Sequence, residues 1–398
     1  MTVEIRPATS EEMEEVVRIA ALTLAEPRET FRHIRPEWTL CAFEDRRLAT
    51  TFAAYPLTMR FNGNDIPVGA VTCVGTLPIY RRRGHLRRIM TTYFEQLHEQ
   101  GERSIAILYA SWAAIYQRFG YAVVSVHHSY KVEPRYVRFS HPQSVPGTLR
   151  ETTKGELELL SHIFDRSGKL RTGHLSRHPS RWDHDLLTPH PPKADLSILL
   201  YEEDAEQLGY VIYSTEEAFH DGPGPWQRLS IRELVWLTPA AYRAFWDCLG
   251  NMDAVREIVW RCVPEDDPLP HLLLEPRMLR TTVWDGILAR LVDLPKGLSA
   301  RPYAGPATLT FHVLDDLCPW NDGRWKLETL GTKTTVSRTD ATPQLVMPVS
   351  TLAMLVFGQI SATEAFRMGR LDAPDQYALP QWDAVMRTQY RPFCPDTF

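Results

Sequence analysis

The chain has 398 residues, a formal net charge of −5 and 44% hydrophobic residues, which predicts two or three domains that each bury a core. No segment approaches the ~20 consecutive apolar residues needed to span a bilayer, and the first residues hold no apolar signal segment, so we expect a cytoplasmic protein that is not bound to membranes. The six cysteines are scattered without a Cys-x-x-Cys pair, which argues against a disulfide framework or a zinc site.

Residues 1–135 alternate between expected strands and helices. Val3–Arg6 is an expected strand, and Ser10 an expected N-cap of a helix that reaches about Ala25, with acidic residues in its first turn. The further elements are strands at 39–44 and 48–60, a turn at 62–65, a strand from residue 71, a helix at 84–100, a buried strand at 104–109, a helix at 111–118 and a closing strand at 121–131.

The segment Val71–Met90 carries the clearest chemical signal of the chain. A strand of β-branched residues runs into a turn, a basic loop around Gly84 and an amphipathic helix. Such a loop leaves backbone N–H groups unpaired at the positive end of the helix, where a pyrophosphate can bind. Gly84 lies where a side chain would block the approach of a ligand to the backbone. The flanking cationic residues are Arg81, Arg82, Arg83, Arg87 and Arg88.

A basic helix start can also be a solvated face or a nucleic-acid patch. Five arginines in one loop of an acidic chain are a local feature, and no basic stripe or pair of aromatic residues extends them, so we expect no nucleic-acid partner. The sequence has no Gly-x-x-x-x-Gly-Lys-Ser/Thr, and only one glycine lies at the turn, which argues against a P-loop and a Rossmann site.

The middle of the chain repeats the pattern of the first part. A hairpin at 196–214 and a strand at 229–237 precede Thr238 and Pro239, which read as the N-cap and first residue of a helix at 240–249, followed by a strand at 257–262. This turn has neither glycine nor basic residues, so we expect a second, degenerate copy of the fold that binds no pyrophosphate.

The last third is predicted as an α+β region. Strands are expected at 288–294, 307–312, 325–329 and 334–338, followed by two short helices separated by Gly358. This pattern resembles sterol-carrier-protein-2-like domains, and a general α+β appendage without a lipid cavity is the alternative. Upstream, His174, His178 and His184 lie close in sequence, but Pro179 interrupts any helix that would align them. We expect a surface segment there and no metal site.

The loop Arg81-x-x-Gly84-x-Leu86 resembles the acyl-CoA loop of GCN5-related N-acetyltransferases (GNAT), although Leu86 departs from the usual Gly or Ala. Over the whole length the chain resembles the Eis (enhanced intracellular survival) family. The segments that carry this resemblance are 72–90, 114–121, 267–273, 284–303 and Phe398. The resemblance implies tandem acetyltransferase folds at 1–135 and 136–285, a sterol-carrier-protein-2-like domain at 286–398, and assembly as a homohexamer.

The resemblance also implies acetyl-CoA as co-substrate and assigns residues to it. The pantetheine arm would bind strand edge atoms of Val74, Gly75 and Thr76, with Tyr116 and Gln117 near the thiol. The pyrophosphate would bind the loop residues Arg82, Arg83, Gly84, His85, Leu86 and Arg87.

The catalytic residues implied by the resemblance are Tyr121 as general acid and the terminal carboxylate of Phe398 as general base. A phenol, with a pKa of about 10, stays protonated at neutral pH and can protonate a thiolate. Tyr116, four residues before Gly120, is the alternative acid. Thr397 makes the chain end less acidic than in relatives with Glu at that position.

The substrate implied by the resemblance is a small polyamine or aminoglycoside-like molecule. Glu26 and Phe31 follow the first helix, where the family has an acidic and an aromatic residue for the amine, and Trp38 is a second candidate for the aromatic role. The alternative function is a lipid-carrier or assembly protein whose acetyltransferase folds are only structural.

Overall fold

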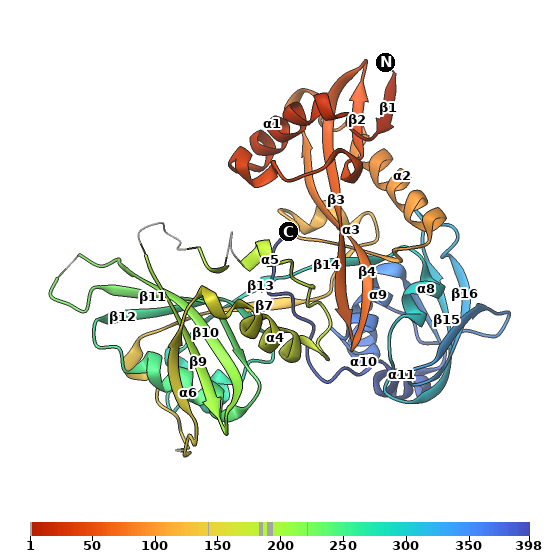
Figure 1. Ribbon diagram of the computed structural model, residues 1–398. Helices are drawn as coiled ribbons and strands as arrows, with labels where there is room; N and C mark the ends of the chain where they lie inside the picture. The colour runs from red at the N-terminus through yellow and green to blue at the C-terminus, as the bar shows by residue number, and fades with distance from the viewer. Residues whose placement is uncertain (1, 142, 183–185, 189–193, 221) are drawn as a thin grey trace. The chain divides into compact units, whose positions relative to one another are not determined.

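The computed structural model describes residues 2–398 apart from 142, 183–185, 189–193 and 221. The chain forms two compact units. One, here called the composite unit, contains residues 1–125 and 286–398, and the other, the central unit, contains residues 126–285. Figure 1 therefore shows the composite unit in the red-to-orange and the teal-to-blue parts of its colour scale. None of the described helices is long and apolar enough to cross a bilayer.

The first sheet of the composite unit has the strand order β1-β2-β3-β4-β5-β14-β6. Its strands are β1 (Val3–Arg6), β2 (Cys41–Glu44), β3 (Arg47–Phe61), β4 (Asn64–Thr76), β5 (Ile105–Leu108), β14 (Leu288–Leu291) and β6 (Ala122–Val123). The helices α1 (Met13–Leu24), α2 (His85–Gln100) and α3 (Ala113–Gln117) connect them. The apolar face of α2 packs onto this sheet in one hydrophobic core.

Most predicted elements of this region are confirmed, and one helix start is corrected. The N-cap is Thr9 rather than Ser10, because Thr9 and Glu12 form a capping box around the short 3₁₀ turn Ser10–Glu12 that precedes α1. The hairpin between β2 and β3 turns at Asp45 and Arg46, both with positive φ. This is the backbone conformation that two-residue hairpin loops need.

The expected closing strand at 121–131 is wrong, because the structure divides it between two sheets. Only β6 belongs to the first sheet, whereas β7 (Val126–Val132) pairs with β12 and β13 in the central unit. β14 lies between β5 and β6. The strand that the sequence predicted as the first of the last third therefore belongs to the first sheet. Gly286 N–H donates to Ser125 O (2.9 Å) where the exchanged segments meet, and a Cβ on Gly286 would lie 2.4 Å from Ser125 Oγ.

The central unit repeats the topology of the first sheet. Its strand order is β8-β9-β10-β11-β12-β7-β13, in which the exchanged strand β7 takes the position that β14 has in the first sheet. The strands are β8 (Thr148–Thr152), β9 (Asp195–Glu203), β10 (Glu206–Glu217), β11 (Gln227–Trp236), β12 (Val255–Pro264) and β13 (Arg280–Asp285). Its helices are α4 (Leu157–Gly168), α5 (Pro179–Arg181), α6 (Pro239–Gly250) and α7 (Leu269–Leu272).

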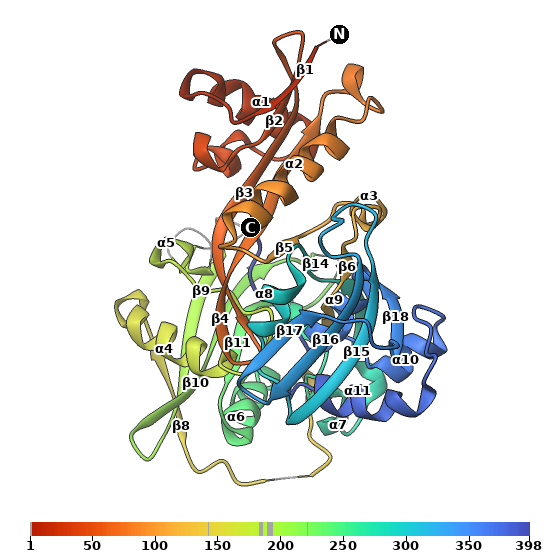
Figure 2. The same cartoon turned by 90° about the vertical axis from the view of Figure 1, so that its right-hand side faces the viewer.

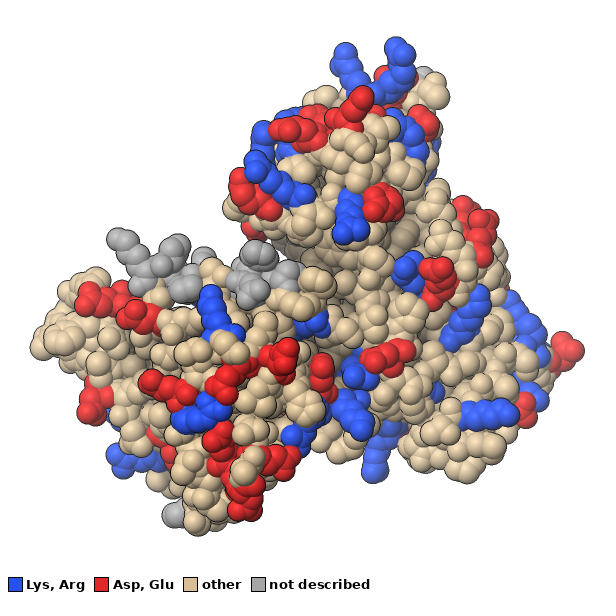
Figure 3. All heavy atoms as spheres, viewed as in Figure 1, with Lys and Arg blue, Asp and Glu red and all other residues tan. Residues whose placement is uncertain are grey.

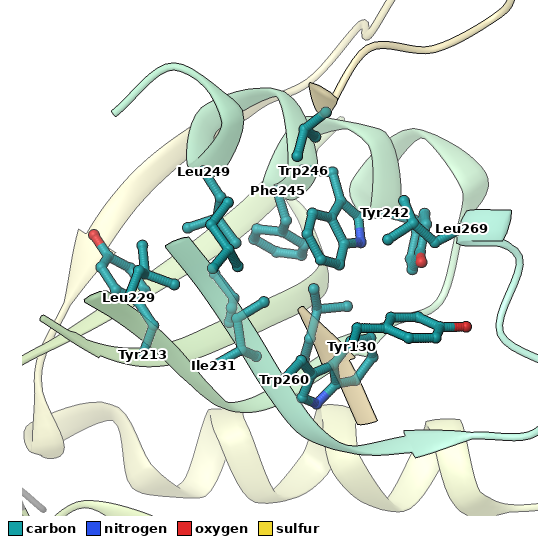
Figure 4. Close-up of a cluster of buried hydrophobic side chains, with 14 of the residues drawn as sticks. Tyr130, Tyr213, Leu229, Ile231, Tyr242, Phe245, Trp246, Leu249, Trp260 and Leu269 are labelled. Carbon is teal, nitrogen blue, oxygen red and sulfur yellow. The ribbon is translucent and has the colours of Figure 1, made fainter. Parts of the chain in front are cut away.

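The core of the central unit is aromatic. Figure 4 shows Trp246 and Phe245 of α6 facing Trp260 and Tyr130 of the sheet, and all four side chains are buried. The predicted helix start is confirmed, since Thr238 Oγ1 accepts a hydrogen bond from Ala241 N–H (3.2 Å). His174 is buried and stacked on Phe164, so the expected surface position is wrong for this residue. His184 lies outside the described residues.

The last third of the chain adds a four-stranded sheet to the composite unit, in the order β17-β16-β15-β18 (Figure 2). The strands are β15 (Pro306–Leu314), β16 (Gly323–Leu330), β17 (Thr334–Arg338) and β18 (Leu345–Pro348). The helices are α8 (Leu294–Ser299), α9 (Val349–Phe357), α10 (Ala362–Arg367) and α11 (Leu379–Met386). Gly358 ends α9 in the left-handed conformation (φ 83°), as its place between two predicted helices indicates.

A buried carboxyl group makes the stability of the central unit depend on pH. Asp267 accepts hydrogen bonds from Tyr242 Oη (2.8 Å) and Leu269 N–H (3.0 Å), yet burial raises its pKa to about 7. An aspartate in the unfolded chain has a pKa of about 4, so the folded state binds this proton more tightly. The free energy of unfolding therefore falls as the pH rises from about 4 through 7.

We expect Asp267→Asn to remove this pH dependence, because the amide keeps an acceptor oxygen and cannot ionise. Urea unfolding followed by tryptophan fluorescence at pH 5 and pH 8 measures it, since tryptophans line this core. The variant should lose less stability between the two pH values than the wild type. Asp253→Asn, at an exposed position, is the control. An unchanged pH dependence in Asp267→Asn would show that other groups cause it.

Candidate active site

The start of α2 is an open anion-binding site. The first hydrogen bond of the helix joins Arg88 N–H to Gly84 O (3.2 Å), so the N–H groups of the first three helical residues have no acceptor within the helix. Gly84 is the N-cap with φ 81° and provides no capping side chain. Apart from its chain neighbours, Gly84 has no atom of the described residues within 4 Å of a Cβ built on it, so the space in front of these donors is open. These residues fit a pyrophosphate.

A buried carboxylate holds the loop in place. Glu44, at the end of β2, is 5% exposed and pairs with the guanidinium of Arg83, while its other oxygen lies 3.0 Å from His85 Nε2. The His85 side chain is itself buried, and Leu86 packs against the core. Of the predicted pyrophosphate residues, His85 and Leu86 therefore have only their backbone N–H groups available, whereas Arg82 and Arg87 have exposed side chains.

The edge of β4 next to this loop has no neighbouring strand in the part of the chain that the structure describes. Pairing with β5 ends at Val71, so Thr72–Thr76 are bonded only to β3 on the other side. A bulge at Cys73, with φ 59°, interrupts the ladder here, and Thr51 Oγ1 donates to Cys73 O (2.8 Å). The predicted pantetheine residues Val74, Gly75 and Thr76 lie on this edge. An extended ligand can add to such an edge as a further strand.

The corresponding helix start in the central unit differs in chemistry. α6 begins with Pro239, which has no N–H group, and the hydroxyl of Thr238 already accepts the Ala241 N–H. Fewer free donors remain there, and no basic residue lies in the turn. The contrast with α2 supports the expectation that only the composite unit binds the cofactor.

Tyr121 is enclosed in the core of the composite unit. It is 1% exposed, with its ring centroid 6.0 Å from that of Phe94 and 6.2 Å from that of Tyr116. Its hydroxyl has no hydrogen-bond partner among the described residues. Burial raises the pKa of Tyr121 well above its ordinary value and that of Tyr116 to about 12, so both phenols are protonated at neutral pH. Tyr116 lies in α3, next to the exposed Gln117.

The chain end docks onto the sheet at the point where β4 and β5 separate. Thr72 Oγ1 donates to the backbone oxygen of Phe398 (3.4 Å), and the Phe398 ring lies 5.3 Å from that of Tyr109. Tyr109 Oη donates to Cys394 O (3.2 Å). Figure 1 and Figure 2 both show the C-terminus beside β4. A terminal segment held by such contacts is ordered, whereas most chain ends fray.

The predicted substrate residues do not form one cluster. Trp38 packs edge-on against Tyr55 (5.5 Å), whose hydroxyl lies 2.8 Å from His33 Nε2. Glu26 is exposed just after α1, and Phe31 is buried at the end of a short 3₁₀ turn. Trp38 is therefore part of an aromatic and histidine group, which the sequence did not indicate.

Comparisons with known proteins agree with this geometry. Residues 4–124 and 173–291 each match a family model described as an acetyltransferase (GNAT) domain, and residues 294–395 match a sterol carrier protein domain. An uncharacterized N-acetyltransferase of Streptomyces avermitilis is 30% identical over 345 residues, which cover 84% of this chain and 83% of the relative. The N-acetyltransferase Eis of Mycobacterium tuberculosis is 29% identical over 336 residues, 80% of this chain and 78% of that protein.

The crystal structure of Eis1 from Mycobacterium abscessus superposes with a TM-score of 0.86 and 28% sequence identity, covering 100% of both chains. This chain belongs to the Eis family of GNAT N-acetyltransferases. The predicted fold class, tandem GNAT folds followed by a sterol-carrier-like domain, is thereby confirmed. GNAT enzymes use acetyl-CoA as co-substrate, which fits the open donors at the start of α2.

Several residues around the candidate site carry no recognisable signal in the sequence. Glu44 ends an apolar strand without a recognisable motif, and Thr72 and Tyr109 become relevant only once the chain end docks beside them. Arg290 donates to Phe119 O, two residues before Tyr121, because β14 is inserted into the first sheet. A charged residue inside the apolar run 287–292 was the one local signal that could have indicated it.

We expect Glu44→Gln to weaken acetyl-CoA binding roughly 10-fold, because a neutral amide holds Arg83 and His85 less strongly than a carboxylate does. Isothermal titration calorimetry measures the dissociation constant. Glu11→Gln, at an exposed position, is the control. Equal affinities for the Glu44 variant and the wild type would show that the loop keeps its shape without this carboxylate.

Proposed function

We propose that the enzyme transfers acetyl from acetyl-CoA to an amino group of a small polyamine or aminoglycoside-like substrate, with Tyr121 as general acid and the Phe398 carboxylate as general base. The observation that carries this proposal is the docking of the chain end at Thr72, where the edge of β4 becomes free. A terminal segment without a function would not need to be held there by both its last residue and Cys394.

The binding part of the proposal rests on backbone groups. The N–H groups at the start of α2 would hold the pyrophosphate, assisted by the exposed side chains of Arg82 and Arg87. The free edge of β4 would hold the pantetheine arm and direct the thioester along Val74–Thr76. Since the edge becomes free just after Val71, the reacting end of the substrate would lie near Thr72 and the chain end.

Acetyl transfer to an amine requires two proton movements. The amine must lose a proton as it attacks the carbonyl carbon, and the departing thiolate must gain one. Tyr121 is protonated at neutral pH, and its hydroxyl has no other partner among the described residues, so it can donate. An α-carboxylate, with a reference pKa of about 3.5, is ionised and can accept a proton, directly or through one water.

The amine site would lie on the side of Trp38 and Tyr55. Aromatic faces attract cations, and the Trp38 ring already has the guanidinium of Arg35 4.9 Å from its centroid. Thr397 contributes no charge beside the terminus. We therefore propose that substrates with fewer positive charges bind better here than they do in relatives with an acidic residue at that position.

The alternative function is a lipid-carrier or assembly protein with structural acetyltransferase folds. The anion site at the start of α2 and the docked chain end have no role in that function. Consumption of acetyl-CoA with a panel of amines distinguishes the two functions. The proposal predicts turnover with at least one multi-amine substrate.

Binding of acetyl-CoA should depend on Gly84. A side chain there would fill the space in front of the α2 donors and would also strain the backbone at φ 81°. We expect Gly84→Val to abolish binding, and titration calorimetry of the wild type to give one site per chain. Gly369→Val, at another open glycine with φ 67°, is the matched control. Retained affinity in the Gly84 variant, or two sites per chain, would contradict the proposed site.

Proton transfer should depend on Tyr121 and on the position of the chain end. We expect Tyr121→Phe, and separately an extension of a few residues after Phe398, to lower turnover by ~100-fold or more. Acetyl-CoA affinity should stay unchanged, because the pyrophosphate site lies in a different element. Steady-state kinetics with calorimetry of the same variants measures both. Full turnover in either variant would remove that residue from the mechanism.

A further inference from the structure

A fully buried arginine contacts the turn that precedes the proposed acid, Tyr121. Arg290, on β14, is 1% exposed, and its Nη1 donates to Phe119 O (2.5 Å), two residues before Tyr121. Its guanidinium lies 4.7 Å from the centroid of the Phe94 ring, and this ring packs against Tyr121. Arg290 therefore contacts both the backbone before Tyr121 and one of the two aromatic rings beside it.

The turn between Phe119 and Tyr121 is shaped around this guanidinium. Gly120 has φ 79°, and a Cβ there would lie 1.9 Å from Arg290 Nη1. Backbone and side chain are thus in close contact, so a shift of the guanidinium shifts the turn. Tyr121 follows directly and has no hydrogen bond from its hydroxyl to fix it among the described residues, so packing and this turn set its position.

A carboxylate from the last third of the chain holds the arginine. Both oxygens of Asp315 accept from Arg290 Nη2 at 2.7 Å, and Asp315 is buried like the arginine. Asn321 Nδ2 and the backbone N–H of Cys318 also donate to Asp315, both at 3.1 Å. These residues follow the central unit in sequence, whereas the Phe119–Tyr121 turn precedes it. They are Arg290, Asp315, Cys318 and Asn321.

We propose that Arg290 is a positioning residue for acetyl transfer, and that Asp315 holds it so that the Phe119–Gly120 turn places the Tyr121 hydroxyl. This inference rests on the proposed function, since it assigns Arg290 a role through Tyr121. It gives the sterol-carrier-like region a part in catalysis that does not involve a lipid. A displacement of the reacting groups by about 1 Å can lower a rate ~100-fold, so small changes behind Tyr121 should be measurable.

The test compares Arg290→Met with Arg301→Met. Arg301 is also fully buried in the composite unit, where its Nη2 donates to Met386 O (2.5 Å) at the end of α11 and contacts no part of the Tyr121 turn that the structure describes. Both variants lose a buried cation, so both should be less stable. At a temperature where both are folded, we expect a 30- to 100-fold lower kcat only in Arg290→Met, with unchanged affinity for acetyl-CoA.

Two further variants distinguish positioning from general damage. Asp315→Asn keeps the shape of the side chain and should lower kcat less than Arg290→Met does, while Arg290→Lys should recover part of the rate. In the Tyr121→Phe background, Arg290→Met should lower kcat no further, because the group that it positions is absent. If Arg290→Met does not fold, Asp315→Asn provides the same comparison.

Equal losses of kcat in the Arg290 and Arg301 variants, or losses that add to that of Tyr121→Phe, would overturn the role of Arg290. Full turnover in Tyr121→Phe alone would instead overturn the proposed acid, so the two failures are distinguishable.

Discussion

The antiparallel pairing of β14 with β5 is the constraint on which the rest of the composite unit depends. The four buried residues of β14 follow the central unit in sequence, and they pair with the four buried residues of β5, which precede it. Leu288 pairs with Leu108 at one end and Leu291 with Ile105 at the other. This pairing completes the first sheet and carries Arg290 into its core. It also places everything after residue 291, including the chain end, in one compact unit with the first GNAT fold.

The composite arrangement is what the proposed role of the terminal carboxylate requires. A free chain end would lose conformational entropy on each encounter with a substrate. Here the tail is fixed at several points, since Arg391 donates to Gln359 O (2.9 Å) after α9 and Tyr109 holds Cys394. The buried Arg290–Asp315 pair holds the turn before Tyr121 in the same unit. Removing one partner of such a pair typically costs ~3–5 kcal/mol, so the site and the fold depend on the same residues.

Surface charge supports the local nature of the anion site. On the face of the N-terminal part seen in Figure 3, basic and acidic side chains alternate without a large area of one sign. In the proposed function, the loop before α2 would therefore attract acetyl-CoA locally, since this face has no large area of positive charge. Glu44 pairs with Arg83 and so neutralises part of the positive charge of that loop. Its contacts with Arg83 and His85 therefore fix the shape of the loop and do not add to its attraction for anions.

Local patterns predicted the elements, while the pairing of distant strands stayed hidden. The hairpin at Asp45 and Arg46, the helix after Gly84 and the cap at Thr238 each follow from a few neighbouring residues, and the structure confirms them. The exchange of β7 and β14 could not be predicted, because neither of these short strands carries a local signal for the distant strand with which it pairs. Arg290 and Glu44 were missed because the residues that they contact are distant in the sequence. Asp315 lies 25 residues after Arg290, and Arg83 lies 39 residues after Glu44.

The most direct test of the proposed mechanism replaces the terminal carboxylate of Phe398 by a carboxamide through protein ligation. This change keeps the length of the chain, the phenylalanine ring and the contact with Thr72, and it removes only the charge and basicity of the terminus. We predict that turnover falls ~100-fold or more while the dissociation constant of acetyl-CoA stays the same. Full turnover of the amidated enzyme would contradict the mechanism and show that another group accepts the proton.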